Sequence, residues 1–104
     1  MDLQISGRTA LVTGASAGIG RAIAKSLAAE GVRLAVVARR RELLETLQAE
    51  IGAPLTIIEC DFMREDAPQT IAAAALAGLG AVDILINNAG GSRKFKLDTG
   101  EEQW

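Results

Sequence analysis

The stretch TGASAGIG contains three closely spaced glycines, a pattern that can form a binding site for a phosphate group. Gly14, Gly18 and Gly20 read GxxxGxG between an apolar run and an Ala-rich helical pattern. Glycine allows an abrupt turn, and bare backbone at a helix start lets a phosphate reach free N–H groups at the positive end of the dipole. Ser16 can add a hydroxyl donor. No Gly-Lys-Ser/Thr follows, which excludes a P-loop, and an ordinary tight turn is the alternative interpretation.

The elements that must position this turn alternate between strand and helix patterns. Apolar, β-rich runs predict strands at residues 9–13, 33–38, 55–60 and 81–87. Helical spacing predicts helices from Gly18 to a stop at Gly31, over residues 42–51 before Gly52, and from an N-cap at Asp66 through Gly78. This alternation predicts an α/β fold, a Rossmann-like doubly wound parallel sheet in the order 3-2-1-4. The first two helices would then share one face, the third would cover the other, and the ligand site would lie at the carboxyl ends of the strands.

Composition narrows the class of protein. The 104 residues are 49% hydrophobic, enough for one domain with a core, and contain no Tyr and no His. A net charge of -2 without a basic stripe argues against nucleic-acid partners. The acidic Asp2 does not fit a signal peptide, and no segment approaches the roughly 20 apolar residues of a membrane span. The single cysteine, Cys60, excludes an internal disulfide and is interpreted as a small buried filler. We expect a cytoplasmic protein without a metal site.

Two motifs together resemble one enzyme family. TGASAGIG resembles the TGxxxGxG cofactor motif of the short-chain dehydrogenase/reductase family, and NNAG at residues 87–90 is similar to that family's second motif. The spacing between the motifs, and the pair Cys60–Asp61 at the end of the third strand, also fit. The resemblance covers the whole chain, and it favours a phosphate cradle over an ordinary turn.

The resemblance also implies a role for each matching residue. The backbone from Ser16 to Ile19, including Ala17, would receive the pyrophosphate and the nearby ribose. Asp61 would accept a hydrogen bond from the adenine amino group, with Phe62 beside the ring; a polar strand end is the plainer interpretation of Asp61. Asn88, Ala89 and Gly90 would line the ribose of the nicotinamide half, whereas Asn87 would tie neighbouring strands together.

The end of the second predicted strand favours NADP over NAD. An NAD site usually carries an acidic residue there to bind the ribose 2′-hydroxyl, but this chain has Ala38 followed by Arg39, Arg40 and Arg41. An arginine pairs with a 2′-phosphate, and cations at a helix N-terminus oppose the dipole, so helix stability gives no reason to place three there. Arg39 is the leading contact and Arg40 the second. Many NADP-preferring relatives also have a basic residue where this chain has Ala17.

The family's catalytic Tyr, Lys, Ser and Asn are not found in these residues. The chain has no Tyr, and its last residues, EEQW, resemble the start of the family's fourth helix, which carries the catalytic Asn beyond Trp104. The last predicted strand would also be an exposed apolar edge. Residues 1–104 are therefore interpreted as the N-terminal part of a single NAD(P)-binding domain. The resemblance implies an oxidoreductase acting on a small carbonyl or alcohol substrate, homo-oligomeric at full length; a non-catalytic nucleotide-binding or interaction module is the alternative.

Overall fold

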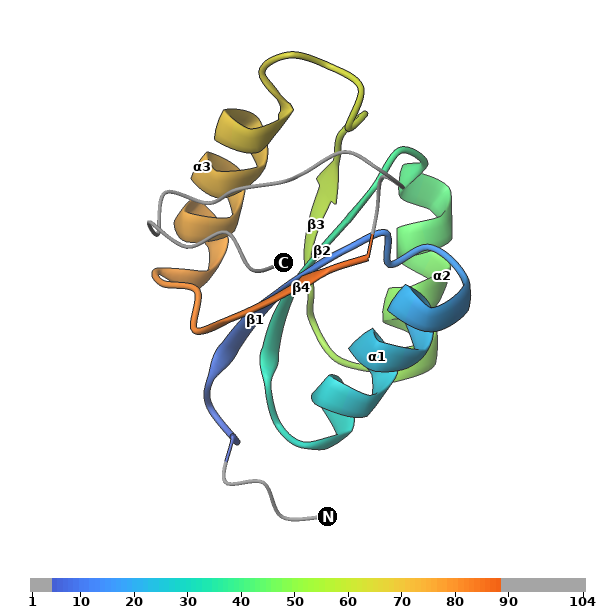
Figure 1. The fold of residues 1–104 in the computed structure, drawn as a ribbon. Helices are drawn as coiled ribbons and strands as arrows, with labels where there is room; N and C mark the ends of the chain where they lie inside the picture. Colours follow the sequence, from blue (N-terminus) through green and yellow to red (C-terminus); the bar gives the residue numbers. More distant parts are fainter. Residues whose placement is uncertain (1–4, 89–104) are drawn as a thin grey trace.

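Strands and helices alternate along the chain in the computed structural model, which describes residues 5–88 (Figure 1). The elements are β1 (Thr9–Thr13), α1 (Gly18–Ala29), β2 (Arg33–Ala38), α2 (Arg41–Ile51), β3 (Thr56–Glu59), α3 (Ala67–Leu79) and β4 (Ile84–Asn87). The four strands form one parallel sheet in the order β3-β2-β1-β4. The predicted fold class and strand order are confirmed.

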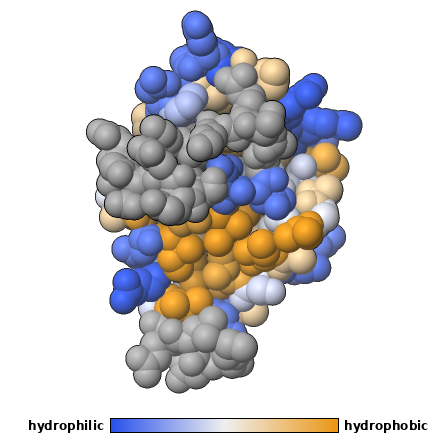
Figure 2. Space-filling view, viewed as in Figure 1, coloured by the Kyte–Doolittle hydropathy of each residue, from blue (hydrophilic) through white to orange (hydrophobic). Residues whose placement is uncertain are grey.

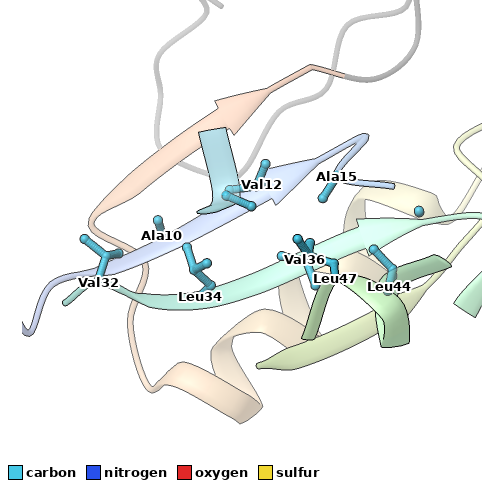
Figure 3. Close-up of a cluster of buried hydrophobic side chains, with 10 residues drawn as sticks. Ala10, Val12, Ala15, Val32, Leu34, Val36, Leu44 and Leu47 are labelled. Atoms are coloured by element: carbon cyan, nitrogen blue, oxygen red, sulfur yellow. The ribbon is translucent and has the colours of Figure 1, made fainter. Parts of the chain in front are cut away.

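The two central strands are buried on both faces because helices cover both sides of the sheet. Val12 and Val36 point into a core with Leu44 and Leu47 of α2, on the face that α1 also covers (Figure 3). On the other face, alternate residues of the same strands pack with α3, and the main contacts there are Leu11, Val37, Ile58, Ile71, Ala75 and Leu79. This division confirms the prediction that the first two helices share one face and the third takes the other.

Two strands are shorter than predicted. We expected residues 55–60 and 81–87, but β3 covers Thr56–Glu59 and β4 covers Ile84–Asn87. Just before β4, the Asp83 carboxylate accepts a hydrogen bond from the Thr9 amide at 3.0 Å. The Asp83 amide also donates to the Thr9 carbonyl at 3.1 Å, and β4 begins at the next residue, Ile84, three residues later than predicted.

The predicted N-cap position of α3 is confirmed, but its chemistry differs. Asp66 is the N-cap residue and Pro68 lies in the first turn. The Asp66 side chain makes no cap hydrogen bond and instead accepts two hydrogen bonds from Arg64, both at 3.1 Å. An adjacent guanidinium therefore holds this carboxylate away from the helix N–H groups.

An apolar surface lies along the edge of the sheet at β4. Among residues 5–88, β4 pairs only with β1, and all four of its residues are half-buried. In the same view, Figure 2 shows apolar side chains gathered in the middle of the molecule, where β4 lies in Figure 1. Among residues 5–88, β4 is therefore an edge strand as predicted, but it is half-buried rather than exposed. In the described part of the chain, no helix has the length and hydropathy to cross a membrane.

Candidate functional site

The three glycines of the turn between β1 and α1 have different structural reasons to be glycine. Gly14 and Gly18 have positive φ angles of 65° and 61°, where other residues are strained. A Cβ at Gly20 would overlap the Gly14 carbonyl and would lie 2.7 Å from the Asn88 side-chain nitrogen. A Cβ at Gly18 would meet no atom within 4 Å. Gly20 is thus needed for close packing, whereas Gly18 leaves an open approach to the backbone.

This open approach leads to the N-terminus of α1. The N-cap residue Ala17 is extended, with φ −157° and ψ 165°, and no side chain caps the helix. Ile19 in the first turn is 70% exposed. The first N–H groups of a helix lack intrahelical acceptors, so an uncapped and uncovered N-terminus can bind an anion.

A cavity of about 310 Å³ lies beside the glycine turn, at the carboxyl ends of the strands. It brings together residues that follow β1, β2 and β3, and its lining consists of Gly14, Ser16, Ala38, Arg39, Asp61, Phe62 and Met63. Five of the residues predicted for the cofactor site, from three separate segments, therefore share one cavity. Asp61 accepts a hydrogen bond from the Met63 amide at 2.9 Å, which shapes the rim.

Met63 was missed by the sequence analysis. Met63 is 67% exposed although it lines the cavity. The signal that could have found it is its place directly after Asp61 and Phe62, because residues at the same strand end share one edge of the sheet.

The three arginines before α2 differ in their partners. Arg40 pairs with Glu42 at 3.5 Å and Arg41 with Glu45 at 3.3 Å, whereas Arg39 lines the cavity and has no carboxylate partner within residues 5–88. The argument that helix stability explains none of the arginines is therefore wrong for two of them. The argument holds for Arg39, which makes no ion pair within residues 5–88 and shares the cavity with Asp61. Arg40 does not line this cavity.

The NNAG motif joins the glycine turn through β1. The Thr13 hydroxyl donates to Asn87 Oδ1 at 3.1 Å and accepts from the Asn88 amide at 3.0 Å. Asn87 thus ties β1 to β4, as predicted, and Asn88 lies against Gly20. The predicted site residues Ala89 and Gly90 lie outside the described residues.

Arg21 is a second residue that the sequence analysis missed. Its guanidinium donates to the Ser16 carbonyl at 3.3 Å and to the Leu43 carbonyl at 3.2 Å, and it pairs with Glu50 at 2.9 Å. It therefore connects the glycine turn to α2. The available signal was an arginine near the start of α1, where a cation opposes the helix dipole and needs another reason to be present.

The remaining candidate groups fit structural roles. Cys60 is buried on the α3 face, and burial raises the pKa of its thiol, which agrees with the interpretation as a filler. Within residues 5–88, no cluster of three His, Cys, Asp or Glu side chains could hold a metal. A larger cavity of about 460 Å³ lies at the other end of the sheet, beside Arg33, Thr56 and Gly78. It lies away from the switch point where open α/β sheets bind ligands.

Known proteins resemble the chain in both sequence and structure. Nodulation protein G of a Rhizobium species is 45% identical over 87 residues, which cover 84% of this chain and 36% of that protein. A fatty acyl-CoA reductase of Acinetobacter baylyi is 43% identical over 91 residues, covering 85% of this chain and 31% of the reductase. The chain thus spans about a third of the length of these curated relatives.

Solved structures extend the likeness to the fold. A metagenomic short-chain oxidoreductase in complex with NADP has a TM-score of 0.75 and 43% identity, over 82% of this chain and 40% of that one. Hydroxysteroid dehydrogenase from Escherichia coli has a TM-score of 0.77 and 34% identity, over 90% and 41%. A family model for short chain dehydrogenases matches residues 8–104. Together with the glycine turn, the cavity and the paired asparagines, this match shows that the chain belongs to the short-chain dehydrogenase family.

Proposed function

We propose that the chain is the cofactor-binding part of an NADP-dependent oxidoreductase that acts on a small carbonyl or alcohol substrate. The observation that carries the cofactor preference is Arg39, a cation without a carboxylate partner in residues 5–88 that lines a cavity beside the glycine turn. A buried or cavity-facing cation is stabilised when a bound anion supplies its counter-charge. The NADP complex of a 43% identical structural relative supports the same choice.

The residues of the site fit such a dinucleotide. The uncapped start of α1 and the open backbone at Gly18 would hold the pyrophosphate. Asp61 and Phe62 offer a carboxylate and an aromatic face within one cavity, as an adenine ring requires. At Ala38, where NAD sites usually have an acidic residue, there is no carboxylate to repel a 2′-phosphate.

The chain's own contribution would be to bind and orient the cofactor. When bound, the nicotinamide supplies hydride transfer to or from the substrate. The backbone around the glycine turn and Asn88 would fix the cofactor's position, and Arg39 would select its phosphorylated form. Because residues 1–104 contain neither Tyr nor His, we place the proton-transferring group, and the expected Asn-Ser-Tyr-Lys set, in the rest of a longer polypeptide.

The replacement Arg39→Asp tests the cofactor preference in the full-length enzyme. The variant should bind NADPH about 10- to 100-fold more weakly, because a charge-assisted hydrogen bond contributes about 1.5–3 kcal/mol, and should keep its NADH affinity. Arg41→Asp is the matched control, since Arg41 pairs with Glu45 and does not line the cavity. Isothermal titration with both cofactors measures the effect. An unchanged NADPH-to-NADH affinity ratio in Arg39→Asp would refute the proposal.

A further inference from the structure

We propose that Arg21 is a positioning residue that sets the distance between two phosphate-binding regions and so creates the preference for a dinucleotide with a 2′-phosphate in addition to its pyrophosphate. The inference rests on the proposed function, because it takes the glycine turn and Arg39 as those two regions. The observation behind it is that the Arg21 guanidinium donates hydrogen bonds to backbone carbonyls in both the glycine turn and α2.

The contacts of Arg21 reach from one region to the other. One nitrogen, Nη1, donates to the carbonyl of Ser16, which lines the cavity, and to the carbonyl of Leu43 in the first turn of α2. The other, Nη2, donates to the Thr46 hydroxyl at 3.3 Å and meets Glu50 at 2.9 Å. The glycine turn and the start of α2, which directly follows Arg39 and Arg40, are therefore held at a fixed separation.

Arg21 is not itself available to a phosphate. Its side chain is 19% exposed, and its donors are directed to protein acceptors. Its charge is balanced by Glu50, which Lys25 also contacts at 3.2 Å; hydrogen bonds from Arg21 and then Lys25 hold the pKa of Glu50 below its usual value. A residue neutralised in this way acts on the cofactor through the backbone that it holds.

The two forms of the cofactor should respond differently to this spacing. NADH places a charged group only at the glycine turn, whereas NADPH must satisfy the glycine turn and Arg39 at the same time. A ligand that binds two sites gains from both only where their separation matches. Loss of the hydrogen bonds from Arg21 should therefore weaken NADPH binding more than NADH binding. Binding of a nucleotide that carries only the 2′-phosphate should change least.

The experiment compares Arg21→Met and Arg21→Lys with wild type in the full-length enzyme, by titration with NADPH, NADH and 2′-AMP. Arg21→Met should lower the NADPH-over-NADH preference about tenfold and change 2′-AMP affinity less than about twofold. Arg21→Lys retains the charge beside Glu50 but loses the planar group that holds both carbonyls, so its preference should fall to an intermediate value. The control is Lys25→Met, which removes the other cation that contacts Glu50. Because Lys25 makes no hydrogen bond to the glycine turn, this variant should keep the wild-type preference for NADPH over NADH.

The outcomes separate this inference from the proposed function. If wild type itself shows no NADPH preference, the proposed function fails. If wild type prefers NADPH, the Arg21 variants could keep the wild-type ratio of NADPH to NADH affinity while binding both cofactors more weakly by the same factor. In that case Arg21 supports only the glycine turn, and the inference is overturned. If Arg21→Met does not fold, as judged by thermal melting, the ratio in Arg21→Lys decides by the same criterion.

Discussion

The two ends of strand β1 carry the same residue type but use it differently. At the amino end, the Thr9 hydroxyl donates to the Asp83 carboxylate at 3.2 Å and accepts from the Asp83 amide at 3.0 Å. At the carboxyl end, the Thr13 hydroxyl donates to Asn87 and accepts from the Asn88 amide. Both threonines therefore join β1 to β4, one through a carboxylate and the other through paired asparagines.

The difference lies in what surrounds each threonine. Near Thr9 the Asp83 carboxylate is stabilised by the Thr9 amide and hydroxyl, which lower its pKa. Near Thr13 the chain turns at glycines, leaves a helix N-terminus without a capping side chain, and places Arg39 in a cavity without a carboxylate partner among the described residues. Polar groups at the amino end satisfy one another, whereas groups at the carboxyl end remain available to a ligand. We therefore expect the amino end to contribute to stability alone and the carboxyl end to contribute to both stability and cofactor binding.

The largest expected effect comes from removing the two hydroxyls separately. Thr9→Val and Thr13→Val should each lower the free energy of unfolding by about 1 kcal/mol, because each removes the hydrogen bonds that a buried hydroxyl makes between β1 and the chain at β4. Only Thr13→Val should also weaken NADPH binding, since the Asn88 amide loses its acceptor beside Gly20. Urea denaturation and NADPH titration of the full-length enzyme measure the two quantities. Weaker NADPH binding in Thr9→Val would contradict the proposed difference between the two ends of β1.

A comparable effect should follow from adding one methyl group at either of two equivalent glycines. Gly18 and Gly52 both have positive φ, 61° and 76°, and a Cβ at either meets no atom within 4 Å. Replacement by alanine should cost about 1 kcal/mol of stability in both cases, from backbone strain alone. Only Gly18→Ala should lower NADPH affinity, because its methyl group would occupy the open approach to α1. Equal affinities in the two variants would show that Gly18 is not part of the phosphate site.

The smallest effect should be a dependence on pH at the amino end. A carboxyl group with a lowered pKa contributes stability above its unfolded pKa, and the contribution is lost as the pH falls through its folded pKa. The pKa of Asp83 lies below the usual 3.8, mainly because the Thr9 amide donates to it. Asp83→Asn should therefore be less stable than wild type at neutral pH, and the difference should shrink as the pH falls below 3.8. Thermal melts across pH 2–7 check this expectation; a constant difference would contradict it.

Much of the fold was predictable because it depends on local patterns. Apolar runs, helical spacing and glycine stops placed every element in order, and parallel crossovers then determined the sheet. The contact between Asp83 and Thr9, just before β4, was not predictable because the two residues are far apart in the sequence. Local periodicity holds no information on such a pair.

The site was predictable where a motif specifies backbone geometry and less so where it depends on side-chain partners. The cavity brings together residues from the glycine turn and from the ends of β2 and β3, as the topology requires. The sequence analysis ranked Arg39 ahead of Arg40, but it did not predict that Arg40 and Arg41 pair with Glu42 and Glu45 on α2. Arg21 was missed because its acceptors lie on a different helix.

The central claim is that the cofactor binds at the carboxyl ends of the strands and not at their amino ends. Hydrogen–deuterium exchange of the full-length enzyme, with and without NADPH, tests this claim most directly. We expect NADPH to slow exchange in the glycine turn, at Arg39 and at Asp61 to Met63, around the cavity at the carboxyl ends of the strands. Exchange near Thr9, Thr56 and Asp83 should not change. Protection around the amino-end cavity at Arg33, Thr56 and Gly78, without protection in the glycine turn, would contradict the account.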